Sequence, residues 1–328
     1  AGCFFVLASS PPVFNMAPDA DHELGAVPAQ PYELRNWILC SLILITYVAG
    51  ALWWLFAKEG DYRCNPKAAE VPALCFDIAA ALYFTVVLAL SYLEPRPLVV
   101  DYAVVGRPDI PSCRRSFRGM GRWIAFTLWS NTLGTLYYWV AAAVGMLVRS
   151  GQNVPRPLCV AQEVLWEITL PMAFLINIVV TAVLIPMMNK QGKFETLFWM
   201  TRWKSLSLHN GFCIAAAIEC GLAAPRAVLD HLPIMMLYGS AYVIFAWGLW
   251  CMTGVYLYFF LDPRFRPAPL GLLALQALLA ALYFLGSSAT AAALGPWPWT
   301  ARAGVLVLAL ATCTWRHRNA VDPSVRST

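Results

Sequence analysis

Long apolar runs separated by charged residues are the feature that most limits what this chain can fold into. A helix that crosses a bilayer core of about 30 Å needs about 20 mostly apolar residues. Runs of this length lie at 36–57, 71–93, 123–148, 164–188, 205–224, 232–261 and 270–294. An eighth run, at 303–315, is short and follows a Pro-Trp-Pro-Trp turn, so it either crosses, tilts at the interface or re-enters. The pattern predicts an all-α, polytopic transmembrane bundle of seven or eight spans.

The composition and the placement of charge agree with a membrane environment. Hydrophobic residues make up 60% of the chain and charged residues only 12%, which excludes a water-soluble globule. With eight crossings, the loops on one side carry 16 of the 23 Lys and Arg residues and the loops on the other side carry 7. The positive-inside rule then places both termini in the cytosol. Topology thus accounts for the net charge of +5, and we expect no nucleic-acid partner.

Three regions follow from these boundaries. Residues 1–35 contain Pro, Ala and acidic residues without the basic start of a signal peptide, which indicates a flexible cytosolic arm. Residues 36–315 form the transmembrane domain, and 316–328 form a cytosolic tail. We expect a multipass protein of an endomembrane, such as the endoplasmic reticulum, or of the plasma membrane.

The cysteines and histidines lack metal-binding spacing. Ten cysteines are scattered without a CxxC pair, and the four histidines are far apart, so neither a metal site nor another cofactor is predicted. Cys64 and Cys159 both fall in loops on the non-cytosolic side. They pair if that side faces an oxidising lumen, but two free, packed thiols are the favoured interpretation.

Polar side chains inside the spans are the candidate functional residues, because each costs several kcal/mol in lipid unless it has a partner. They are Asp77, Thr127, Ser130, Asn131, Glu167, Asn177, Thr181, His209, Asn210 and Glu219. Thr127 and His209 follow the entrance tryptophans of the third and fifth spans by four and six residues. Both spans enter from the cytosolic side, so these two side chains are expected at similar depth in one leaflet.

A hydroxyl beside an imidazole is the outline of a nucleophile and its general base. The structural alternative is that Thr127 bonds the carbonyl four residues earlier and that His209 is a packed interhelical residue. Ser130 and Asn131 lie on the Thr127 face of the same helix, where they either donate to an oxyanion or join helices. His231 is interpreted as a loop or interface residue.

Three blocks of sequence resemble one known family. They are WIAFT at 123–127, a histidine followed ten positions later by a glutamate at 209 and 219, and TGVYLY at 253–258 followed by FLD at 260–262. This pattern resembles the androgen-induced-gene family of integral-membrane threonine hydrolases over about 117–286. The resemblance implies a six-span core in which Thr127 is the nucleophile and His209 its catalytic partner. It also implies esters of fatty acids with hydroxy fatty acids as substrates, and no cofactor.

The chain departs from that pattern in two places. The stretch LDHLP at 229–233 matches the family's His-rich loop only in part, and 204–208 lacks a second histidine. In the third block, Tyr256 and Tyr258 are interpreted as an aromatic belt at the membrane interface rather than as substrate contacts. The competing class of function is non-enzymatic: a multipass membrane transporter or scaffold whose polar residues bind a solute or join helices.

Overall fold

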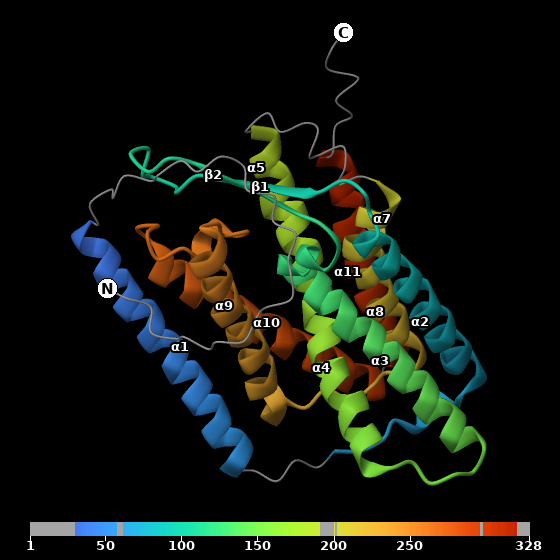
Figure 1. Ribbon diagram of the computed structural model, residues 1–328. Helices are drawn as coiled ribbons and strands as arrows, with labels where there is room; N and C mark the ends of the chain where they lie inside the picture. The colour runs from blue at the N-terminus through green and yellow to red at the C-terminus, as the bar shows by residue number, and fades with distance from the viewer. Residues whose placement is uncertain (1–29, 58–61, 191–199, 201, 296–297, 320–328) are drawn as a thin grey trace, which may run out of the picture.

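The computed structural model describes residues 30–57, 62–190, 200, 202–295 and 298–319. Figure 1 shows a bundle of helices with a small β-hairpin lying across one end. The first half comprises α1 (Pro31–Ala57), η1 (Pro66–Ala69), α2 (Val71–Tyr92), β1 (Leu98–Tyr102), β2 (Cys113–Phe117), η2 (Gly119–Ile124) and α3 (Phe126–Arg149). Then come α4 (Arg156–Ile178), η3 (Val179–Leu184), α5 (Ile185–Lys190), α7 (Trp203–Leu206), η4 (Ser207–Gly211) and α8 (Phe212–Leu222). The remainder comprises η5 (Leu229–His231), α9 (Leu232–Thr253), η6 (Phe259–Leu261), α10 (Ala268–Leu294) and α11 (Pro298–Asn319).

The all-α polytopic prediction is confirmed. Among the described residues, six helical stretches are long and apolar enough to cross a membrane. They are Tyr32–Phe56, Val71–Tyr92, Phe126–Arg149, Arg156–Asn189, Leu229–Thr253 and Ala268–Leu294. The predicted span at 205–224 is helical but divided, because the π-helical turn η4 interrupts it between α7 and α8. The short eighth run forms α11, whose apolar part, Pro298–Cys313, is shorter than these six.

Several predicted boundaries are wrong. The sixth run does not continue to Leu261, because α9 ends at Thr253 and Gly254 follows with a φ of 74°, a conformation that disfavours side chains with a Cβ. Residues 31–35, assigned to the arm, belong to α1, and 316–319, assigned to the tail, belong to α11. Residues 1–29 and 320–328 lie outside the described residues.

The β-hairpin was not predicted. Strands β1 and β2 pair antiparallel, with Leu98 opposite Phe117 and Tyr102 opposite Cys113. The Tyr102 hydroxyl donates to Asp262 Oδ2 at 2.5 Å, and Arg264 donates to the same carboxylate. The buried Tyr102 bond ties the hairpin to the segment between α9 and α10, and the two form a cap over the end of the bundle at which α3 begins.

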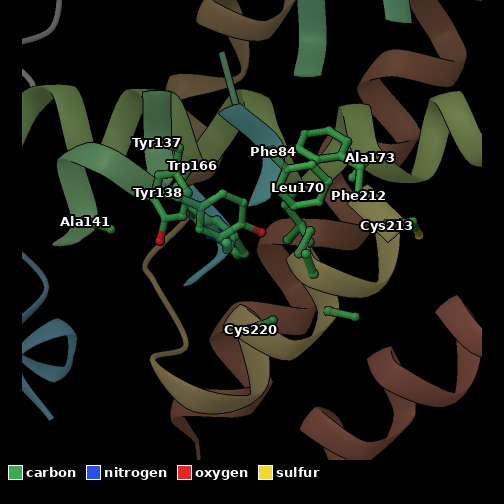
Figure 2. Close-up of a cluster of buried hydrophobic side chains, with 14 of the residues drawn as sticks. Phe84, Tyr137, Tyr138, Ala141, Trp166, Leu170, Ala173, Phe212, Cys213 and Cys220 are labelled. Carbon is green, nitrogen blue, oxygen red and sulfur yellow. The ribbon is translucent and has the colours of Figure 1, made fainter. Parts of the chain in front are cut away.

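An aromatic core holds α2, α3, α4 and α8 together (Figure 2). Phe84, Tyr137, Tyr138, Trp166 and Phe212 are each at most 2% exposed, and the rings of Phe84 and Phe212 meet edge to face with centroids 5.7 Å apart. Lipid tails are as apolar as these rings, so the rings stabilise the bundle through close packing and ring–ring contacts rather than through removal from water. Because Phe212 directly follows η4, this packing also sets the position of the π turn against α3.

The expectation of two free thiols at the opposite end is wrong. Cys64 and Cys159 form a disulfide with Cα atoms 4.5 Å apart. It joins the segment before η1 to the first turn of α4, across a sequence separation of 95 residues. Sequence spacing could not show this proximity, since it depends on how α2 and α3 return the chain to the same face.

Candidate functional site

Thr127 is the second residue of α3. The N-cap position is Ala125, which has no side-chain hydrogen bond to the helix, so the first-turn amides of α3 lack the usual side-chain cap. A helix N-terminus of this kind stabilises negative charge. Thr127 is half-buried, and the phenol of Tyr258 lies near its hydroxyl.

His209 lies within the π-helical turn η4. Such turns occur frequently at functional sites, because the extra residue changes the direction in which side chains leave the helix. The Nδ1 atom of His209 lies 3.1 Å from Ser205 Oγ, one helical turn earlier. The ring is half-buried. Ser205, which hydrogen-bonds the imidazole of His209, was not predicted from the sequence.

Asn131 joins the two segments that carry Thr127 and His209. Its side-chain amide donates to the Thr127 carbonyl at 2.8 Å and to the Leu208 carbonyl at 2.9 Å. The Asn131 side chain is fully buried. The first turn of α3 and the peptide before His209 are therefore neighbours, as the depth argument expects. Direct contact between the Thr127 hydroxyl and the imidazole stays a prediction.

Ser130 makes a second contact between helices. Its hydroxyl donates to the Phe126 carbonyl at 3.0 Å and lies 2.9 Å from the hydroxyl of Tyr238 in α9. Both Ser130 and Asn131 thus have the geometry of the interhelical alternative, and their donors are already in use. Neither side chain is arranged as a free oxyanion donor.

Tyrosines surround the start of α3. Tyr256, interpreted from the sequence as part of an aromatic belt at the membrane interface, is instead buried: it is 1% exposed and stacks on Trp250 with centroids 5.8 Å apart. For the half-buried Tyr258 that interpretation stays a prediction. Tyr242 donates to the Ile124 carbonyl at 2.7 Å. Burial raises the pKa of Tyr258 to about 12, so its phenol stays protonated at neutral pH and can donate a hydrogen bond beside Thr127.

A pair of carboxyl groups is buried deeper in the bundle. Asp77 in α2 and Glu219 in α8 are fully buried neighbours, and Tyr137 donates to Glu219 at 2.9 Å. Neither carboxylate oxygen of Asp77 has a hydrogen-bond partner among the described residues. Two adjacent carboxylates cannot both be ionised in an apolar interior. One of the two therefore carries a proton. Glu219 follows His209 by ten residues along the same helical segment. The carboxyl pair therefore lies at a different depth from Thr127 and His209.

A third polar cluster occupies the end of the bundle near the disulfide. Glu163 and Glu167 of α4 and His231 of η5 are buried, and each offers a ligand atom within 4.8 Å of the others. His231 Nδ1 lies 2.9 Å from Glu167 Oε1. His231, predicted to be a loop or interface residue, is thus buried where η5 contacts α4. The spacing rules used on the sequence missed this group because 64 positions separate His231 from Glu167.

The fold and these sites define a multipass helical membrane protein with polar groups at three depths. A scan against protein-family models, a search of curated proteins and a search of solved structures find no match to this chain.

Proposed function

We propose that this protein is a membrane-embedded lipid ester hydrolase with Thr127 as nucleophile and His209 as general base. One observation carries the proposal: Asn131 ties the uncapped start of α3, which holds Thr127, to the π turn that holds His209. The sequence resemblance to the threonine hydrolases places the same two residues in these roles. It also supplies the proposed substrates, esters of fatty acids with hydroxy fatty acids.

The proposed reaction uses groups already at the site. The imidazole accepts the Thr127 proton while Oγ1 attacks the acyl carbon, and it then protonates the leaving alcohol. Water hydrolyses the acyl-threonine and releases the acid. We assign to His209 the tautomer in which Nδ1–H donates to Ser205 Oγ, because this tautomer makes Nε2 the basic nitrogen in the proposed reaction.

The developing oxyanion needs donors, and two sources are in place. The first-turn amides of α3 and the phenol of Tyr258 lie beside Thr127. We assign the oxyanion role to these groups rather than to Ser130 and Asn131. Removing one such donor typically lowers kcat by 100- to 1,000-fold, or about 3 kcal/mol.

The positive-inside rule completes the proposal. It puts both termini and the Thr127 layer on the cytosolic side of an endoplasmic-reticulum or plasma membrane. An acyl chain then enters from the bilayer while water reaches the ester from the headgroup region. The protein needs no cofactor for this reaction.

A fluorophosphonate probe on the purified protein tests the nucleophile. We expect labelling that disappears in Thr127→Ala and persists in Thr132→Ala. Thr132 is a matched control, since it is also half-buried in α3 and bonds the Leu128 carbonyl at 2.7 Å. Thr127→Ser should retain labelling. Labelling that is absent from the wild type, or indifferent to Thr127, contradicts the proposal.

The buried carboxyl pair favours the alternative, a transporter. Ionisable pairs inside a membrane are typical of proton pathways. Proteoliposomes that hold the wild-type protein would then dissipate a pH gradient faster than those that hold Asp77→Asn. Equal rates, together with Thr127-dependent labelling, favour the hydrolase.

A further inference from the structure

Glu163, Glu167 and His231 form a compact buried group at the end of the bundle away from Thr127. Glu163 and Glu167 are four residues apart, so they lie on one face of α4, and His231 comes from η5. The three residues are 4%, 1% and 5% exposed. Their ligand atoms lie within 4.8 Å of one another, close enough to surround a single ion.

Outer contacts hold each of the three side chains. The Arg63 amide donates to Glu163 Oε2 at 2.8 Å, and the Val228 amide donates to Glu167 Oε1 at 2.9 Å. The ring of Tyr62 stacks on His231 with centroids 4.7 Å apart. The neighbouring disulfide at Cys64 fixes the segment that supplies these contacts. Such outer bonds orient the ligands of metal sites.

One atom in the group points to a missing partner. Glu163 Oε1 is buried and has no hydrogen-bond partner among the described residues. The Arg226 guanidinium lies 3.9 Å away, beyond hydrogen-bonding distance, on a side chain that is 41% exposed. A buried carboxylate oxygen left in this state costs about 1–3 kcal/mol or more.

Charge points in the same direction. Two ionised carboxylates beside a neutral imidazole carry a charge of −2, and the half-exposed Arg226 guanidinium at 3.9 Å from Glu163 offsets only part of it. A divalent cation would neutralise the group and also provide the partner of Glu163 Oε1.

A pocket of about 220 Å³ borders the group at Glu163, and Cys64, Asn65, Gln162 and Arg226 also line it. Glu167 and His231 lie behind Glu163 and do not line the pocket. The pocket therefore gives an ion a route as far as Glu163.

We propose that Glu163, Glu167 and His231 bind a zinc-class divalent cation. One imidazole nitrogen with two carboxylate oxygens and an open position suits Zn²⁺. Ca²⁺ takes six to eight oxygen ligands and Mg²⁺ retains several waters, so neither matches this set. The bound ion links α4 to η5, and thereby to the start of α9. This proposal is independent of the hydrolase proposal.

Metal binding to the full-length protein in detergent provides the test. The protein is stripped with EDTA without reductant, to preserve the disulfide, and Zn²⁺ affinity is measured by competition with a chromophoric chelator. We expect one Zn²⁺ per chain and affinity at least tenfold weaker in Glu163→Gln. Glu33→Gln is the matched control: Glu33 is also a buried carboxylate, paired with Arg107, and this change should leave zinc affinity unaltered.

A second measurement uses the wild-type fold alone. Co²⁺ in the site should give visible absorption bands of a low-coordinate N/O complex, which Zn²⁺ displaces. Zinc affinity in the wild type no higher than in Glu163→Gln, or cobalt bands of the hexaaqua ion only, overturns the proposal. A melting temperature raised equally by Ca²⁺ and Zn²⁺ also overturns it. Fluorophosphonate labelling of Thr127 is measured separately, so either proposal can fail alone.

Discussion

Replacing Gly145 with alanine tests how closely α3 packs against η1. A Cβ at Gly145 would lie 2.3 Å from the carbonyl oxygen of Ala68 and 3.0 Å from its carbonyl carbon. Backbone rather than a flexible side chain is the obstacle, so either α3 or η1 must shift. The nearby Asn65 resists such a shift, since its side chain donates to the Ala223 carbonyl at 3.2 Å and accepts from Lys67 N at 3.1 Å. Overpacking of this kind costs about 1–3 kcal/mol.

The same substitution at Gly248 should have the opposite sign. Gly248 lies inside α9, is exposed, and has nothing within 4 Å of an added Cβ. Alanine there gains up to about 1 kcal/mol of helix stability. Thermal unfolding in detergent, followed by tryptophan fluorescence, should give a lower melting temperature for Gly145→Ala and an equal or higher one for Gly248→Ala.

The role of η1 can be isolated with a reductant. If the clash arises because the disulfide at Cys64 holds η1 in place, reduction should narrow the difference in melting temperature between wild type and Gly145→Ala. Equal melting temperatures for Gly145→Ala and wild type before reduction would refute the close approach itself.

Three further predictions concern the disulfide, the hairpin and the buried acids. Cys64→Ala should cost about 2–5 kcal/mol in thermal unfolding and remove the effect of reductant, whereas Cys75→Ala, at an exposed free thiol, should do neither. Hydrogen bonds from Arg107 lower the pKa of Asp109, so the stabilisation from this pair is present above the ordinary carboxyl pKa of about 4 and is lost as pH falls through the lowered value. The difference in melting temperature between wild type and Asp109→Asn should therefore be constant from about pH 7 to 5 and vanish in stronger acid; a difference that persists there would contradict the ion pair. Asp77→Asn places an amide donor beside Glu219 and should leave the melting temperature unchanged or higher, whereas Asp77→Leu leaves Glu219 with only the Tyr137 hydrogen bond and should cost about 1–3 kcal/mol.

Much of the bundle could be predicted because a bilayer demands long apolar helices, and these runs are visible in one dimension. The ends of the helices and the interruptions within them could not be predicted from these runs. The stop of α9 depends on the left-handed conformation of Gly254 inside a sequence that stays apolar to Leu261. The π turn around His209 depends on packing against α3, which no local pattern reveals. The hairpin was missed because short strands carrying Arg114 and Arg115 resemble an ordinary charged loop.

The candidate sites, like the fold, could be predicted only in part. Depth along the spans was enough to expect Thr127 and His209 in one layer. Their neighbours required the fold: Ser205 reaches the imidazole through the turn of a helix, and Tyr258 reaches Thr127 from a segment more than a hundred positions later. The pairing of His231 with Glu167 is likewise a tertiary contact between distant segments. The spacing of residues along the chain does not reveal which distant residues contact each other in the fold.

Helix α1 stands at the edge of the bundle (Figure 1), and only 17% of its most apolar window is buried. Hydrogen bonds near its two ends attach α1 to the rest of the bundle. Asn36 donates to the carbonyls of Pro263, Phe265 and Arg266, and the Trp54 indole donates to the Asp230 carbonyl. The backbone groups of a lipid-facing helix bond to one another, so losing these side-chain hydrogen bonds would leave the backbone hydrogen bonds of α1 intact. Loss of the contacts at one end should therefore loosen α1 as an intact helix, which the packing of Trp37 on Trp247 and the ion pair of Glu33 with Arg107 would still hold against the bundle.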